Sequence, residues 1–134
     1  MRRYYVYLFY DKDRNVIYVG KTKRALKRRM REHFGPRGHL SKSLLKKVRC
    51  IKYYEFSARY KMDLAEAYLI KKYKKTCQNK RKEKIDADEE EFIRKEVVGK
   101  NLKVYADEVR YEEHLVRRIK AKIKKVFSKL KNLI

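Results

Sequence analysis

Two phenols, a guanidinium, an imidazole and a carboxylate lie in the first half of the sequence, on Tyr7, Tyr18, Arg29, His33 and Glu66. Hydrolysis of a phosphodiester bond uses such groups, because it needs an activated water, neutralised charge at phosphorus and help for the leaving oxygen. A guanidinium binds phosphate through parallel hydrogen bonds. A carboxylate binds one hard cation, Mg²⁺ or Mn²⁺, through oxygen. We therefore treat these five residues as candidate catalytic groups and Glu66 as the candidate metal ligand.

The two tyrosines are candidates for positioning or deprotonating the attacking water. An unperturbed tyrosine has a pKa of about 10, so it acts as a base only where a nearby cation or metal lowers that pKa. Lys21 and Arg29 are candidates for the cation. The sequence leaves Tyr7 and Tyr18 both open as the general base, with Tyr7 favoured. Among the twelve tyrosines of the chain, any one taken alone is better explained as core or surface filler.

A β-hairpin is predicted to hold both tyrosines. Residues 4–10 and 16–20 are short apolar runs, rich in aromatic and β-branched residues and separated by polar turn residues. A two-residue loop at 12–13 would set a register in which Tyr7 lies directly opposite Tyr18. Both phenols would then project from the same face of a small sheet.

A helix over residues 25–34 is predicted to carry the guanidinium and the imidazole. Arg29 and His33 are four residues apart, so they share one face of that helix. Their face borders the apolar stripe that would pack on the core, formed by Leu26, Met30 and Phe34. Both side chains are therefore expected to point back at the hairpin.

Glu66 lies on the apolar side of a second helix, predicted over residues 62–75. Its neighbours within about 60° on a helical wheel are Met62, Leu69, Ile70 and Tyr73. A carboxylate in such surroundings is costly unless it is paired, protonated or bound to a metal. The alternative to a metal site is a buried ion pair with Arg29 or a lysine.

The order and spacing of these motifs resemble the GIY-YIG nuclease family. The tripeptides Tyr-Val-Tyr at 5–7 and Tyr-Val-Gly at 18–20 occupy the GIY and YIG positions, with Tyr5 in place of the first glycine. The family's helix pattern, Leu-x-x-Arg-x-x-x-His, is matched by Leu26, Arg29 and His33. The resemblance implies that Tyr7 or Tyr18 is the general base and that His33 assists proton transfer or contacts the phosphate.

The resemblance continues through the second helix. The metal-binding glutamate of the family is matched by Glu66, followed by Leu-Ile, a tyrosine and, after a loop, Asn79. The proline that usually follows the tyrosine is absent, which puts the loop geometry and the role of Asn79 in question. Gly20, Lys21 and Asn79 are expected to support the site. By resemblance, the chain is a metal-dependent DNA endonuclease with one Mg²⁺ or Mn²⁺.

The charge of the chain also indicates a polyanionic partner. The 134 residues carry a formal net charge of +23, and residues 1–80 alone hold 24 basic and 6 acidic residues. Such an excess is typical of nucleic-acid binding. The predicted contacts to the DNA backbone are Lys23, Arg24, Lys27, Arg28 and Arg31. The alternative function is a non-catalytic basic protein that binds RNA or DNA by charge and stacking, although such a protein gains nothing from Glu66.

The predicted fold class is α+β, a small three-stranded antiparallel sheet flanked by helices. The third strand is predicted over 48–56, which gives a nuclease domain at 1–80 and a helical C-terminal extension at 81–134. The extension is expected to pack on the domain or on a second protomer, so a homodimer is possible. With no cysteine-rich module in the sequence, we expect a stand-alone nuclease whose substrate specificity and pathway stay open.

Residues 111–134 are predicted to form a long amphipathic helix with all eight of its basic residues outside an apolar arc. We favour docking of that arc on the chain's own core. The alternatives are pairing with a second protomer or, least favoured, binding to an anionic membrane. The two cysteines form no CxxC motif, and no signal peptide or membrane-spanning run appears. These features predict a cytoplasmic, nucleoid-associated protein without a zinc site or a membrane partner.

Overall fold

Four antiparallel strands form one central sheet in the order β2-β1-β3-β4. A computed structural model describes residues 2–79 and 84–133 of the chain, although not the side chains of 113–119. The strands are β1 (Tyr4–Tyr10), β2 (Val16–Thr22), β3 (Cys50–Phe56) and β4 (Lys103–Ala106). The helices are α1 (Leu26–Phe34), α2 (Lys42–Lys47), α3 (Arg59–Lys72), α4 (Ala87–Val98) and α5 (Tyr111–Asn132). The α+β class is therefore confirmed.

The prediction of three strands is wrong, because β4 adds a fourth strand to the outer edge of β3. β4 has four residues, most of them exposed, and its pairing contains a register shift. A strand that buries almost nothing lacks the apolar alternation from which strands are predicted. The fourth strand nevertheless makes residues beyond 84 part of the same sheet as the hairpin.

The register of the β1–β2 hairpin also differs from the prediction. Tyr7 pairs with Gly20, and Tyr18 pairs with Phe9. The loop is longer than two residues. The Asp11 side chain accepts hydrogen bonds from the backbone amides of Asp13 and Asn15, and Arg14 takes a left-handed conformation with φ 63°, which together set this longer turn. A bulge at Phe9/Tyr10 then adds one more residue to the shift. A slip of two residues conserves the face of every side chain, so the two phenols still share one side of the sheet.

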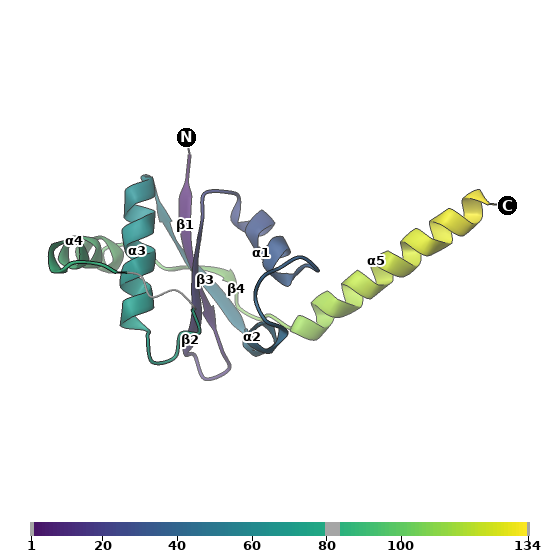
Figure 1. The fold of residues 1–134 in the computed structure, drawn as a ribbon, viewed down its shortest axis with the longest axis horizontal. Coiled ribbons are helices and arrows are strands. Elements are labelled where there is room, and N and C mark those ends of the chain that lie inside the picture. The colour runs from purple at the N-terminus through teal and green to yellow at the C-terminus, as the bar shows by residue number, and fades with distance from the viewer. Residues whose placement is uncertain (1, 80–83, 134) are drawn as a thin grey trace.

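Helices cover both faces of the sheet (Figure 1). Side chains alternate along β1, so Val6 and Leu8 face α3 and α4, whereas Tyr7 and Phe9 face α1 and α2. α4 begins with a reciprocal capping box between Asp86 and the third residue of the helix, and its acidic first turn favours the helix dipole. Two buried clusters, one on each face, hold the sheet in place between the layers.

α5 extends from the body of the molecule into solvent (Figure 1). Its first turn is anchored, because Val109 and Tyr111 are buried in the cluster on the α1 side of the sheet. Further along, Ile123 is 49% exposed and Phe127 is 61% exposed. The described part of the predicted arc is therefore not docked on the chain's own core, whereas the side chains of its first part, Leu115, Val116 and Ile119, lie outside the described residues. None of the described helices is both long and apolar enough to cross a membrane.

Candidate active site

A groove of about 580 Å³ runs along β2, the edge strand of the sheet, and contains most of the predicted site. Because β2 is at the edge, side chains from α1 on one face and α3 on the other line the same groove. The predicted site residues along it are Tyr7, Tyr18, Lys21, Arg29, Glu66 and Asn79. His33 lies just beneath, buried behind Tyr7. The structure thus brings all five candidate catalytic residues into one neighbourhood.

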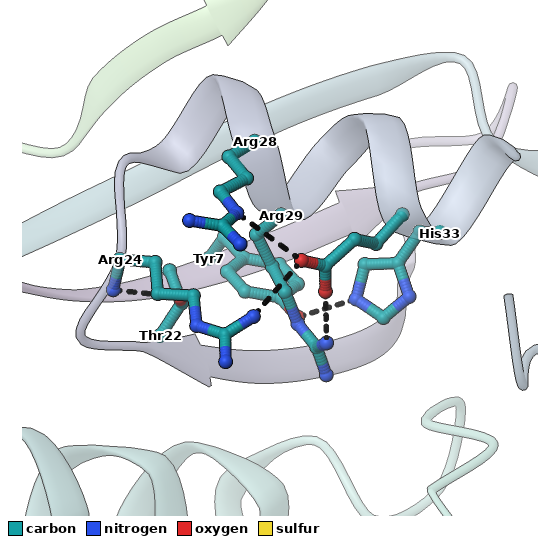
Figure 2. Close-up of polar contacts among 7 residues, drawn as sticks. Tyr7, Thr22, Arg24, Arg28, Arg29 and His33 are labelled. Atoms are coloured by element: carbon teal, nitrogen blue, oxygen red, sulfur yellow. Dashed lines mark hydrogen bonds and ion pairs between the residues drawn. The ribbon is translucent and has the colours of Figure 1, made fainter.

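Tyr7 is the centre of the polar network beneath this groove (Figure 2). Its hydroxyl lies 2.5 Å from His33 Nε2, and Arg29 Nε donates to the same hydroxyl at 3.3 Å. The backbone of β2 approaches the ring so closely that a Cβ at Gly20 would overlap it. Gly20 therefore supports the site by leaving room for the Tyr7 ring, whatever its backbone conformation.

The protonation states of Tyr7 and His33 follow from their burial. Burial raises the pKa of Tyr7 far above its usual value, more than the Arg29 guanidinium lowers it. Burial, with the charge of Arg29 and His39 nearby, lowers the pKa of His33 to about 3. At neutral pH the phenol therefore keeps its proton and donates it to Nε2 of a neutral imidazole. Arg29 is thus the expected cation that lowers the pKa of this tyrosine, but burial outweighs it and the net shift is upward.

Tyr18 is half-buried beside Tyr7, with ring centroids 6.4 Å apart. Burial and the negative charge of Glu66 raise the pKa of Tyr18 to about 12, against a smaller opposing effect of Arg29. Its hydroxyl is therefore also protonated at neutral pH and is not a phenolate. Since Tyr18 lines the groove from the edge strand, it is placed to contact a ligand there.

Glu66 is 8% exposed and forms an ion pair with Lys21, whose Nζ lies 3.3 Å from Oε1. The same ammonium lies 3.1 Å from Asp63 Oδ1, one turn earlier on α3. Burial opposes the charge on Lys21, but the two carboxylates together raise its pKa. The ion pair left open by the sequence is therefore present, with Lys21 as the cation.

The donor set around Glu66 fits a hard divalent ion. Mg²⁺ is usually held by one or two carboxylates, with waters and a substrate phosphate completing its shell. Glu66 and Asp63 offer carboxylate oxygens, and the Lys21 ammonium between them shows that the position accepts positive charge. Among the described residues, no three His, Cys, Asp or Glu side chains gather into a cluster that could hold a metal by itself. A bound ion would therefore depend on water and phosphate for its remaining ligands.

The Asn79 side chain hydrogen-bonds to the backbone of β2, the edge strand. Its Oδ1 accepts from the Val19 amide at 3.0 Å, and its Nδ2 donates to the Val19 carbonyl at 2.7 Å. The Gln78 amide donates to the Ile17 carbonyl at 2.8 Å, so the chain after α3 pairs with the outer side of β2. These hydrogen bonds hold the backbone on both sides of Tyr18. They also hold the loop after α3 against β2, although the family's proline is absent.

The five predicted DNA contacts are all exposed on or just before α1. Sequence reasoning missed Glu32, which pairs with two of them and with Arg29. Glu32 accepts ion pairs from Arg24, Arg28 and Arg29, at 3.2, 3.8 and 2.9 Å. Its position four residues after Arg28 and three after Arg29 was the available signal. Asp63 was missed in the same way, although it lies three residues before Glu66 on one helix face.

The buried imidazole predicts a pH dependence of stability. His33 has a folded-state pKa of about 3 against an ordinary value of 6.5, so the unfolded chain binds more protons between these pH values. The free energy of unfolding should therefore fall as pH drops below 6.5, by up to about 1.4 kcal/mol per pH unit. Urea titrations between pH 7 and 5 should show this slope in the parent. His33→Gln should lack it, and an unchanged slope there would contradict the assignment.

Comparisons with known proteins agree with this geometry. The model of the GIY-YIG catalytic domain matches residues 3–84. UvrABC system protein C of Dictyoglomus thermophilum is 39% identical over 69 residues, which cover 52% of this chain and 11% of that protein. The protein of the same name from Borrelia duttonii is 37% identical over 78 residues, 58% of this chain and 13% of that protein. The chain thus matches only about a tenth of the length of these curated relatives, and no solved structure matches it.

Proposed function

Because the chain belongs to the GIY-YIG catalytic domain family, we propose that it is an endonuclease that hydrolyses phosphodiester bonds of DNA with one divalent metal ion, Mg²⁺ or Mn²⁺. The observation that carries this proposal is the Tyr7 hydroxyl, held between His33 and Arg29 at the base of the groove that Glu66 lines. A phenol, an imidazole acceptor and a guanidinium beside a carboxylate are the parts that hydrolysis of a phosphodiester needs. A protein that only binds nucleic acid has no use for this buried arrangement.

In the proposed mechanism, Tyr7 is the general base and His33 is its proton acceptor. The phenol takes a proton from the attacking water while its own proton passes to His33 Nε2, a path that the 2.5 Å hydrogen bond supplies. This route needs no phenolate before the reaction, which suits the raised pKa of Tyr7. It does require His33 to accept charge, and a phosphate bound to Arg29 would offset one of the positive charges that lower the pKa of His33. Tyr18 has no such acceptor described in the structure, so we assign it to positioning the water or the phosphate.

Arg29 is proposed to bind the scissile phosphate. Its guanidinium reaches the groove from α1 and is held by Glu32 at 2.9 Å. A phosphate oxygen can replace that carboxylate as the partner of the fork. Glu66 would hold the metal ion with Asp63 as a neighbouring donor, and Lys21 would then turn to the phosphate. The ion, when bound, would stabilise negative charge developing on the phosphate oxygens.

The proposed substrate polyanion should make binding strongly salt-dependent. The exposed basic residues of α1 and its leading loop flank the groove, and residues 1–80 carry a large positive excess. Each phosphate neutralised releases counterions, so the logarithm of the DNA affinity should fall linearly with that of the salt concentration. Fluorescence anisotropy in a metal-free salt series measures the slope. An affinity that does not change with salt would contradict both the nuclease and the non-catalytic alternative.

Cleavage assays then separate those two functions. Supercoiled plasmid, flap, junction and single-stranded substrates, each with Mg²⁺, Mn²⁺ or a chelator, test the reaction directly. The proposal expects nicking or cutting of at least one substrate, lost with the chelator. Salt-dependent binding without cleavage of any substrate would favour the non-catalytic basic protein.

A further inference from the structure

α5 presents an apolar stripe that the described part of its own chain leaves open. Its side chains recur at helical spacing, and each of them is about half exposed or more. They are Ile123, Val126, Phe127, Leu130 and Leu133. Ala121, which lies opposite the stripe on the helix, lines a groove with the loop that precedes α2, and Lys122 lines the same groove from the border of the stripe. The stripe therefore faces away from the body that anchors the helix.

A second open patch lies on α3 and α4. Tyr60 and Phe92 stack with ring centroids 6.5 Å apart, although Tyr60 is 57% exposed and Phe92 44%. Phe92 lies in a surface groove of about 570 Å³, whose other lining residues are Asp88, Glu91, Lys95 and Glu96. The patch is thus an exposed aromatic pair whose border carries three carboxylates and one lysine, with Glu91 paired to Lys95 and Glu96 paired to Lys61. Exposed aromatic residues are enriched at protein interfaces, whose rims are polar.

Charge selects between the possible partners of the stripe. Residues 114–134 contain eight basic residues and no acidic one, whereas residues 83–113 contain six basic and eleven acidic residues. Two α5 helices placed side by side would bring like charges together, which opposes pairing. α5 against the acidic border of Phe92 brings opposite charges together and covers both sets of apolar side chains.

The two surfaces cannot meet within one chain. α4 lies at one end of the long axis of the molecule and α5 extends from the other (Figure 1). We propose that α5 of one copy docks its apolar stripe on the Tyr60–Phe92 patch of a second copy. The contact is heterologous, so it either closes reciprocally into a dimer or repeats from copy to copy. It lies away from the groove along β2, so the activity proposed above does not depend on it.

Two charge-reversed chains test this contact. The α4 variant is Asp88→Lys with Glu91→Lys, and the α5 variant is Lys120→Glu with Lys131→Glu, at two exposed lysines that border the stripe. Light scattering on nucleic-acid-free protein, from micromolar to sub-millimolar concentration, should show that the parent associates. Each variant alone should associate at least about tenfold more weakly, because its two substituted residues now meet like charges on the facing surface. An equimolar mixture of the two variants should associate again, since the substituted glutamates of one variant can then face the substituted lysines of the other.

The controls decide between this contact and its rivals. Asp13→Lys with Asp107→Lys changes two exposed acidic residues elsewhere and should associate like the parent. Phe92→Ser removes the aromatic receptor without altering charge and should weaken association as the α4 variant does. Parent-like association of both the α4 variant and Phe92→Ser would indicate α5–α5 pairing and overturn the proposal. So would a monomeric parent whose α5 binds phosphatidylglycerol vesicles, or a mixture of folded variants that stays monomeric.

Discussion

Glu66→Gln should reduce metal-dependent nicking of supercoiled plasmid by orders of magnitude, about 10² or more, because the carboxylate that would hold the ion is gone. DNA binding should persist or tighten, since one negative charge near the phosphate is removed. The fold should survive, because Lys21 keeps Asp63 as a partner at 3.1 Å and is not left as a stranded buried cation. Plasmid nicking, gel shifts and thermal melts on the same preparation separate these three effects.

Matched variants sharpen that result. Arg29→Ala should lose cleavage in parallel, because Arg29 is proposed to bind the scissile phosphate. Arg28→Ala, on the exposed side of α1, should mainly weaken binding. Asp63→Asn should lower the apparent metal affinity less than Glu66→Gln does, because Asp63 is a neighbouring donor. A Glu66→Gln chain that is folded, binds DNA and cuts at the parent rate would end the proposed mechanism.

Tyr7→Phe is expected to have the second large effect, a loss of cleavage of about 10² to 10⁴. The ring that fills the core remains, but the proton path to His33 is removed. The variant should also be less stable by about 1–3 kcal/mol, because the buried Nε2 of His33 loses its hydrogen-bond partner. Single-turnover cleavage rates and urea unfolding measure the two losses independently.

Tyr18→Phe is the natural comparison, since it removes the second phenol of the groove from a half-buried position. Its cleavage rate should fall less than that of Tyr7→Phe, and its stability should change little. The reverse order, with Tyr18→Phe the slower enzyme, would assign the general base to Tyr18. If the imidazole accepts the phenolic proton, His33→Gln should lower the single-turnover cleavage rate as Tyr7→Phe does.

The hairpin shows how far sequence reasoning reaches and where it stops. Apolar runs and helical spacing were sufficient to place Tyr7, Tyr18 and Arg29 on the correct elements and faces. The register was wrong by two residues, because it depends on the Asp11 hydrogen bonds and the left-handed Arg14, which no hydrophobic pattern encodes. The error left the chemistry intact only because an even shift preserves the face of a strand.

Other features were missed because they follow from tertiary contacts. The sequence predicted that Arg29 would lower the pKa of Tyr7. In the structure, burial raises that pKa by more than Arg29 lowers it. The partner of Glu66 is set by the approach of β2 to α3, which brings Lys21 to a residue 45 positions further along the chain. An amphipathic pattern predicted α5 as a helix but not what its apolar stripe touches, because periodicity shows which side is apolar and not what covers it.

The short strand β4 has a practical meaning for anyone who isolates the catalytic region. It covers the backbone amides and carbonyls of β3, while the chain at 76–79 covers the outer side of β2. A fragment cut at residue 80 would lose β4, together with Ile93 and Val97 of α4, and expose a bare strand edge beside an opened core. Bare edges recruit further strands, so the smallest piece with every catalytic side chain should precipitate where the longer chain stays dispersed.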